Sequence, residues 1–590
     1  MVIDNEKKEN PARDLVAEIF EKELKKILKN ISANFDTLHI LGEYAEFMYR
    51  NDHFNEGEHI RTANELIPPL LLKNYNPNAV SNEKYSYEDY LSICNFLRDF
   101  LTLRDTIFYS HADNEAVTWS IDEKYIKVVI NDDSILRQYA SEMMSFTLNS
   151  RNLPYDEVDA DPVKLLKGTT HFNFDDMNVA RAFSTIESIV DWKMNFYFSY
   201  IPENSDVMLD GYKYSLFIDI YKKILTLALY ERYFSKANNL SGVITYREDE
   251  LLEQAILQHP EENHMTLKKI FRDIAESSRS TFNYIPTENK FMLYPTCFSL
   301  VDGVSNMLKH FAKTDPNSFS SNVSEIMGKG LVNKVKLKFE QYPNHKLYSN
   351  VKLDNFDPKL PDIDLLVISY EPSLGFHVFI GEVKNNLPAV WGKDYLKATG
   401  EKGFITKAIS QIETIKSFLN TDNGLMFIYN LAIEAFPNLK LNLIFPHGIC
   451  IIVDTLIISS QSVGMFFPEN TIPIMNGDIL CHIIDESDGD TNYILFHLKK
   501  HSNFINECTS RKTKAITIGD YTIEHDIITL KKIYALSKNK FVSVGAIEMI
   551  EKESLDSGYT MAGALRHLGN KDYYMDIENR PQNMSIFVIH

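Results

Sequence analysis

Two short apolar segments, PDIDLLV at 361–367 and IGEVK at 380–384, carry charged residues where a buried β-strand normally has none. Because side chains alternate between the two faces of a strand, Glu382 and Lys384 point to the same face. The interval between Asp364 and Glu382 has room for a strand end, a turn and the return strand of a hairpin. If the segments pair, two carboxylates and one ammonium meet at one end of that hairpin. Ionised groups on apolar strands are costly unless compensated, and a divalent cation compensates them well.

An aspartate, a hairpin and Glu-x-Lys in this order resemble the motif of the PD-(D/E)XK nuclease superfamily, and Pro361 with Asp362 supplies its first two letters. The flanking pattern also resembles the superfamily core, which runs helix, three strands, helix, strand. An amphipathic helical pattern occupies 323–339, and a second one occupies 404–419. Strand-like runs occupy 346–353, 439–445 and 449–453, with a turn at 446–448. The resemblance covers about residues 320–455.

The resemblance implies a magnesium site and phosphodiesterase activity. Asp364 and Glu382, with the backbone carbonyl of Val383, would ligate Mg²⁺, for which Mn²⁺ would substitute, since small hard cations select oxygen ligands. The ion would polarise the scissile phosphate and lower the pKa of a bound water. Lys384 would orient that water and stabilise the developing charge. Its ammonium lies near two carboxylates and is expected to stay charged, which suits electrostatic stabilisation better than general-base catalysis.

Three further residues have candidate roles with open alternatives. Glu325, in the first turn of the first helical pattern, is a candidate ligand of metal or water, but an acid there also complements the helix dipole. Gln411 matches a glutamine that recurs in restriction-endonuclease-like branches, where it would touch phosphate or water; a glutamine on a helix is also ordinary. Asp362 is expected to support the site, because Asp364 begins the continuous apolar strand.

Charge is distributed unevenly around the motif. The net charge of −20 argues against general adhesion to nucleic acid, because phosphate binding depends on clustered lysine and arginine. However, 329–352 contains six lysines and one acid, Glu340. Four of these lysines are the expected nucleic-acid contacts: Lys334, Lys336, Lys338 and Lys352. Lysines 393, 397, 402 and 407 follow the motif. They predict a basic rim around the site, although a solvated helix face explains the helix lysines equally well.

The chain of 590 residues is long enough for two to four domains. We expect a largely α-helical domain over 1–300, a nuclease-like domain over 301–460 and a C-terminal extension or subdomain over 461–590. The fold class is then α/β. A mostly helical N-terminal region precedes a restriction-endonuclease-like mixed β-sheet core flanked by helices, and a C-terminal α/β extension follows.

Periodicity places the remaining elements. N-terminal helical patterns occupy 11–30, 37–49, 87–108, 135–148, 179–201, 212–236, 247–258, 267–278 and 299–312. A β-hairpin is expected near 117–130, and 286–295, bounded by prolines, is expected to be a linker or a crossing segment. In the C-terminal part, 493–498 and 541–547 have strand patterns, and 529–537 has a helical pattern.

These features predict a Mg²⁺-dependent endonuclease that hydrolyses phosphodiester bonds in nucleic acid, with DNA favoured. A large helical N-terminal region followed by one nuclease core resembles the domain arrangement of many bacterial restriction and phage-defence effectors. Two alternatives stay open: an RNA-directed, toxin-like nuclease, and a catalytically inert nucleic-acid-binding or scaffold protein. Specificity would come from a partner protein or from a homo-oligomer. Five scattered cysteines, an N-terminus without a signal-peptide core and the lack of any membrane-length apolar run predict a cytoplasmic protein with free thiols.

Overall fold

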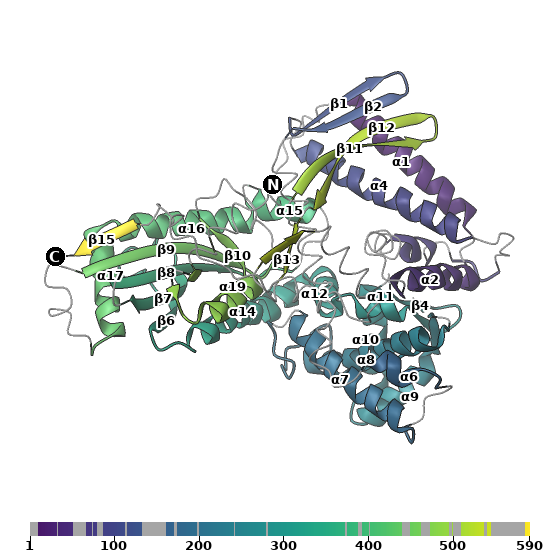
Figure 1. Cartoon of the computed structure of the whole chain (residues 1–590), viewed down its shortest axis with the longest axis horizontal. Helices are drawn as coiled ribbons and strands as arrows, with labels where there is room; N and C mark the ends of the chain where they lie inside the picture. The colour runs from purple at the N-terminus through teal and green to yellow at the C-terminus, as the bar shows by residue number, and fades with distance from the viewer. Residues whose placement is uncertain are drawn as a thin grey trace.

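The computed structural model describes residues 10–31, 34–50, 66–72, 75–78, 86–112, 115–131, 161–169, 174–197, 200–240, 242–278, 281–371, 375–387, 392–400, 402–438, 449–461, 472–491, 493–494, 498, 509–530, 532–535, 540–543 and 585–589. Over these ranges the protein is mixed helix and sheet. A six-stranded sheet with its helices, a helical region and a four-stranded sheet lie next to one another (Figure 1).

The four-stranded sheet combines hairpins from distant parts of the sequence. Its strands, in spatial order, are β1 (Val117–Asp122), β2 (Tyr125–Ile130), β12 (Tyr521–Leu530) and β11 (Thr509–Ile518). Strand β2 runs parallel to β12, so this pairing joins two separate antiparallel hairpins. Helices α1 (Pro11–Asn30) and α4 (Tyr87–Ala112) share its hydrophobic core. Part of the segment expected to extend the C-terminus therefore packs with the N-terminal region (Figure 1).

The helical region is built around α8, which buries residues along its whole length. Its helices are α6 (Pro162–Leu166), α7 (Met177–Phe196), α8 (Tyr214–Asn238), α9 (Glu248–Gln258), α10 (His264–Ser277), α11 (Pro295–Ser299) and α12 (Gly303–Thr314). A small sheet of β3 (Ile244–Arg247), β5 (Lys290–Leu293) and β4 (Phe282–Ile285) lies beside them. Helix α2 (Phe35–Arg50) packs against α11.

The six-stranded sheet has mixed direction. Its order is β10 (Ile474–Asn476), β9 (Ile449–Ser459), β8 (Gly375–Lys384), β7 (Ile363–Glu371) and β6 (His345–Val351), and β15 (Ser585–Ile589) also pairs with β9. Strands β6, β7 and β8 are antiparallel, whereas β8, β9 and β10 are parallel. A separate hairpin consists of β13 (Lys532–Ala535) and β14 (Lys540–Ser543).

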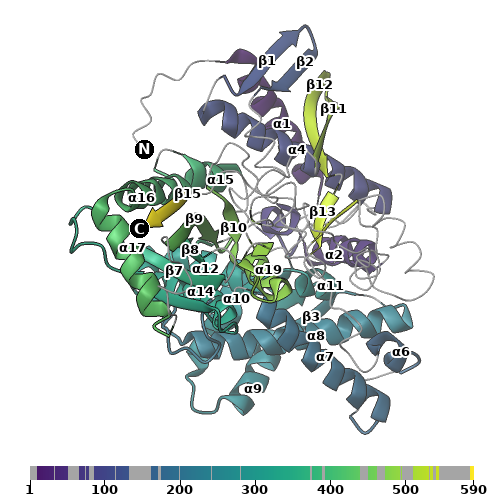
Figure 2. The ribbon, with the colours of Figure 1, turned by 60° about the vertical axis from the view of Figure 1, so that its left-hand side comes forward.

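Two helices cover each face of this sheet: α14 (Ser324–Phe339) and α19 (Gly477–Ser487) on one, α16 (Phe404–Leu419) and α17 (Asp422–Ala435) on the other (Figure 2). Strand alternation determines which side chains meet which helices. On β7, Leu365 and Val367 pack with α14 and α19, and Leu366 and Ile368 pack with α16 and α17. Helix α14 follows a π-helical turn, η2 (Phe319–Val323), and α15 (Gly392–Thr399) precedes α16.

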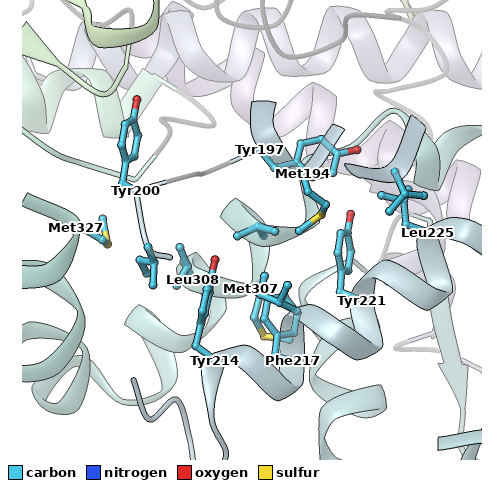
Figure 3. Packing of buried hydrophobic residues seen from close by; sticks show 14 of the residues in the cluster. Met194, Tyr197, Tyr200, Tyr214, Phe217, Tyr221, Leu225, Met307, Leu308 and Met327 are labelled. Atoms are coloured by element: carbon cyan, nitrogen blue, oxygen red, sulfur yellow. The ribbon is translucent and has the colours of Figure 1, made fainter. Parts of the chain in front are cut away.

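One hydrophobic core joins the helical region to the sheet. It extends from Leu166 to Leu498 and contains side chains of α7, α8, α12, α14 and β7. Figure 3 shows part of it, where Met327 of α14 lies close to Tyr200, which follows α7. A Cβ added at Gly330 of α14 would lie 2.0 Å from the carbonyl oxygen of Tyr200. The backbone of α14 and the backbone of Tyr200 in the helical region are therefore in direct contact at this point.

The structure corrects three local expectations. The expected linker at 286–295 is the turn and second strand of the β4–β5 hairpin, where Asn289 adopts φ of 51°, a left-handed conformation that asparagine tolerates. The helix expected at 529–537 is wrong over its described residues, because 529–530 continue β12 and 532–535 form β13; pairing in two hairpins, with β11 and with β14, overrides local helix propensity. The strand expected at 493–498 is also wrong. Residues 493–494 and 498 are helical, and Ile494 and Leu498, four apart, share the core.

Other expectations fall outside the described residues. These are the helix at 135–148, the strand at 439–445, the turn at 446–448 and the end of the strand at 541–547, of which 540–543 form β14. Among the helices within the described ranges, none combines the length and apolar character needed to cross a membrane.

Candidate active site

Asp364 and Glu382 occupy facing positions where β7 and β8 stop pairing. The last pair of the antiparallel register at this end joins Leu365 to Gly381. The next position on each strand brings Asp364 opposite Glu382. Facing side chains on antiparallel strands have Cβ atoms about 4.5–5.5 Å apart. The two carboxyl groups therefore lie together on one face of the sheet, at the end of the hairpin.

The carboxylate of Asp364 also takes over a backbone hydrogen bond. Beyond Gly381 the backbone of β8 no longer pairs with β7. The N–H of Val383 donates instead to Oδ2 of Asp364, at 2.8 Å. A backbone N–H away from water needs an acceptor, and this one holds the Asp364 side chain between the separating strand ends. The sequence predicted a role for the carbonyl of Val383; the structure adds one for its N–H.

Lys384 and Gln411 complete the group. The ammonium of Lys384 forms an ion pair with Glu382, two residues earlier on the same face of β8. Its Nζ also donates to Oε1 of Gln411, at 3.0 Å. Gln411 lies on α16 between Ala408 and Ile412, which are buried against the sheet. The apolar face of α16 thus fixes the position from which Gln411 reaches Lys384.

The two carboxyl groups resist ionising together. The side chain of Glu382 is only 3 % exposed. Burial, followed by the negative charge of Asp364, raises the pKa of Glu382 to about 7, against the opposing effect of Lys384. Burial also raises the pKa of Asp364, while the N–H of Val383 acts in the opposite direction.

These properties fit a bound cation. Two neighbouring carboxyl groups whose pKa values are raised by burial gain a favourable partner when a divalent ion binds between them. Over the described part of the chain, no cluster of three or more His, Cys, Asp or Glu side chains is placed to hold a metal. The ligands expected here are two such side chains, Asp364 and Glu382, and one backbone carbonyl, that of Val383. The donors are all oxygens, as magnesium prefers.

The structure does not bring Glu325 to this group. Glu325 is in the first turn of α14, whose buried residues, including Met327 and Leu331, pack on the opposite face of the sheet. Its exposed carboxylate pairs with Lys329, one turn along the same helix. One hydrogen bond links α14 to the strand end that carries the site: the side-chain Nδ2 of Asn385, next to Lys384, donates to the backbone carbonyl of Met327. Sequence reasoning missed Asn385, which no motif marks.

The three helix lysines also lie across the sheet from the site. Lys334 pairs with Asp478 and Lys338 pairs with Asp485, each at 2.6 Å. Both acids belong to α19, which packs beside α14. Lys336 pairs with Glu340 on its own helix, at 3.5 Å. Lys334 and Lys338 therefore link α14 to α19, and Lys336 pairs next to the end of α14. None of the three forms a rim around Asp364.

Two other lysines share the site's face. Lys352 forms an exposed ion pair with Asp362. Asp362 is two residues before Asp364 and so has the same strand parity. Lys407 is exposed and lies one turn before Gln411 on α16. Besides Lys384 of β8, lysines on this side of the sheet thus come from the β6 end and from α16.

Comparison with known proteins adds no further evidence. No protein-family model matches the chain, and neither a curated protein nor a solved structure matches it. The interpretation of the site rests on the geometry of its own residues.

Proposed function

We propose that this chain is a metal-dependent nuclease with a restriction-endonuclease-like core, most suited to DNA. The observation that carries the proposal is the facing pair of Asp364 and Glu382 at the point where β7 and β8 separate, with Lys384 on the same face. A mixed sheet with helices on both faces presents this group at one end. Three ionisable side chains gathered at the ends of two core strands, one of them buried with a raised pKa, are typical of a functional site and suit metal-assisted phosphodiester hydrolysis.

Each residue has a distinct role in this proposal. Asp364 and Glu382, with the carbonyl of Val383, would hold Mg²⁺ or Mn²⁺. The bound ion would polarise the scissile phosphodiester and lower the pKa of the attacking water. Lys384 places a positive charge beside the carboxyl pair, where it orients the water and offsets charge that builds on the phosphate. Gln411 is a positioning residue, because it accepts from the Lys384 ammonium and fixes its direction.

The substrate backbone would approach across the α16 face. Lys352 and Lys407 are the lysines available there for phosphate contacts. With so few cations on a chain of net charge −20, binding would be weak, because few counterions are released and the rest of the surface repels the phosphates. Tight or specific binding would then need a partner chain or self-association.

Cleavage assays with DNA and RNA test the proposal. The wild-type chain should cut one of these with Mg²⁺ or Mn²⁺ and should lose activity in excess EDTA. Asp364→Asn and Glu382→Gln should abolish cleavage, and Lys384→Ala should lower it by about 10²–10³-fold. Asp362→Asn is the matched control, since this acid lies just before β7, two residues from Asp364, but pairs with Lys352.

Three results would decide against the proposal. Full cleavage by Glu382→Gln, or cleavage in EDTA, would place the chemistry elsewhere. Metal-independent binding of nucleic acid without cleavage in the wild type would favour the inert, scaffold-like alternative. Equal loss of activity in Asp362→Asn would indicate a general effect on this end of the sheet.

A further inference from the structure

Two histidines lie buried in one row across the six-stranded sheet. His345 of β6 faces Ser369 of β7, and Ser369 faces His377 of β8. Facing residues on paired strands point to the same side of a sheet. Here that side is the one covered by α14 and α19, because Val367, two residues before Ser369, packs there. His345 is 3 % exposed and His377 is 1 % exposed. The row crosses the strands at the end opposite to Asp364.

The imidazoles of this row carry unpaired polar atoms. Among the described residues, neither His345 nor His377 finds a hydrogen-bond partner for either of its ring nitrogens, which are buried. Most buried polar groups in proteins are paired, so an unpaired one calls for an explanation. Burial lowers the pKa of each histidine from 6.5 to about 4. Both rings are therefore neutral near pH 7.

The surroundings of His345 are aromatic. The rings of Phe339 and Tyr342, at the end of α14 and just beyond it, lie 5.4 and 6.0 Å from the imidazole of His345. The charged side chains on that side act on Tyr342; they are Lys338, Asp485 and Asp488. The edge of His345 that meets α14 is thus apolar.

One acid acts on His377. Burial lowers the pKa of His377, and Asp490, which follows α19, opposes this effect without offsetting it. The carboxylate of Asp490 accepts from the backbone N–H of Tyr493 at 3.4 Å. On β9, Ile452 faces His377, and Asp454 lies two residues further along the same face. Both acids stand beside the imidazole of His377, and neither forms a hydrogen bond with it.

Residues 487–491, here called the covering turn, follow α19 and close over this row. The hydroxyl groups of Thr491 and Ser369 share a hydrogen bond of 2.9 Å, and Thr491 is fully buried. The Nδ2 of Asn344 donates to the carbonyl oxygen of Gly489 at 3.3 Å. The first contact starts from the strand position between the two histidines, and the second starts from the residue before the first of them. Both histidines therefore lie beside contacts that hold the covering turn on the sheet.

The cover is incompletely packed beyond the turn. Ile494 and Leu498 follow the covering turn and reach the hydrophobic core. With Val367 and Phe379, which form the next row of the sheet, they line an apolar cavity of about 10 Å³. Atoms that line a void lack contacts on one side. The cover is therefore held less tightly there than a fully packed element would be.

We infer that His345 and His377 form an acid-sensitive lock on the covering turn. While both imidazoles are neutral, the turn stays closed on the sheet. Protonation of either ring places a charge among apolar side chains without a hydrogen-bonded counter-charge. Release of the turn then lets the protonated rings reach water. Each ring takes up one proton, so opening is linked to two protons.

The direction of the pH dependence follows from proton binding. In the open state the rings have the ordinary histidine pKa of 6.5, whereas in the closed state it is about 4. Stability of the closed state is therefore fully present above pH 6.5 and is lost as pH falls towards 4. At pH 5.5 each histidine multiplies the equilibrium constant for opening about tenfold, and the two together multiply it about 100-fold. The raised pKa of Glu382 has the opposite effect on stability, so the measurement must be local.

This lock is independent of the proposed nuclease chemistry. The row lies near the start of β8 on the α14 and α19 side, whereas Lys384 ends β8 on the other side. An exchange measurement can therefore test the lock without any assay of cleavage.

Hydrogen–deuterium exchange of the full chain at pH 7.5 and 5.5, corrected for the intrinsic exchange rate, tests the lock. The reporters are the backbone N–H groups of Asp490 and Ile494, which donate to the carbonyl oxygens of Ser487 and Asp490. Their protection should fall about 100-fold at the lower pH, because opening exposes them. The amide groups of α8, in the helical region, should keep their protection.

Substitutions separate the two histidines from the rest of the cover. His345→Leu and His377→Leu should each reduce the effect of pH to about tenfold, and the double variant to about twofold or less. Ser369→Ala loses the hydrogen bond with Thr491 and should speed exchange equally at both pH values. His525→Leu is the matched control. It removes a buried histidine with a lowered pKa from β12 of the four-stranded sheet and should keep the full effect.

Three outcomes would overturn the inference. The covering turn of the wild type could keep its protection at pH 5.5. The double variant could lose as much protection as the wild type, which would assign the effect to other groups. Equal loss across α8 would show that acid unfolds the whole chain and that no local lock exists.

Discussion

Asp364 acts as the hydrogen-bond acceptor that Val383 would otherwise find on a neighbouring strand, with its Oδ2 2.8 Å from the Val383 N–H. The bond holds a carboxylate in the gap where β7 and β8 separate, facing Glu382. Because burial raises the pKa of both carboxyl groups, the pair responds both to pH and to cations. The first two predictions use this property.

Replacing Glu382 with glutamine should stabilise the metal-free protein at alkaline pH. The pKa of Glu382 is raised from an ordinary 4.5 to about 7, so between these values the folded state binds more protons than the unfolded state. Stability supplied by this group is therefore present at low pH and is lost as pH rises towards 7. Glu382→Gln imitates the protonated form. It should match the wild type at pH 5 and exceed it by about 1–3 kcal/mol at pH 8, measured by urea unfolding in EDTA. Glu325→Gln, at an exposed acid, should show no such difference.

Binding of Mg²⁺ or Mn²⁺ should strengthen with pH. A cation must displace the proton of Glu382, so affinity should fall by up to about tenfold per pH unit below pH 7 and should level off above it. Isothermal titration at pH 6, 7 and 8 measures this dependence. Asp364→Asn should lose binding, while Asp362→Asn should keep both the affinity and its pH dependence. A pH-independent affinity would mean that the metal binds away from Glu382.

Two glycines on α14 should respond oppositely to alanine. At Gly330 a Cβ would meet the backbone carbonyl of Tyr200 at 2.0 Å, whereas at Gly328 nothing lies within 4 Å. Gly328→Ala should stabilise the protein by up to about 1 kcal/mol, since alanine is the better helix former. Gly330→Ala should destabilise it by about 1–3 kcal/mol, because backbone cannot move aside cheaply. Urea unfolding of the two variants checks the pair, and equal effects would contradict the close contact between α14 and Tyr200.

Reversing charge at Lys334 should affect stability first. Lys334 is partly buried and pairs with Asp478 at 2.6 Å, so Lys334→Glu places two acids together and should cost about 1–3 kcal/mol. Lys336→Glu, at a lysine that pairs with Glu340 over a longer 3.5 Å, should change stability less, by about 1 kcal/mol or below. Asp478→Lys should recover part of the loss when combined with Lys334→Glu. If Lys334→Glu instead weakens nucleic-acid binding at unchanged stability, the lysine faces the substrate after all.

The local arrangement of the candidate site follows from the sequence. Alternation along a strand is enough to put Glu382 and Lys384 on one face, and the interval back to Asp364 is enough for a hairpin. The amphipathic pattern at 404–419 likewise places Gln411 on a helix. These features depend on neighbours within a few residues or across one tight turn, so the sequence by itself determined them.

The tertiary structure decided what depends on distant partners. The helix at 324–339 could pack on either face of the sheet, and its packing with α19 on the face opposite to Asp364 turns Lys334 and Lys338 from expected substrate contacts into partners of Asp478 and Asp485. Pairing of β2 with β12 joins segments about 400 residues apart, and loop closure of that length leaves no local signal. Periodicity reports the face that a residue occupies on its own element, and only packing between elements determines what that face meets.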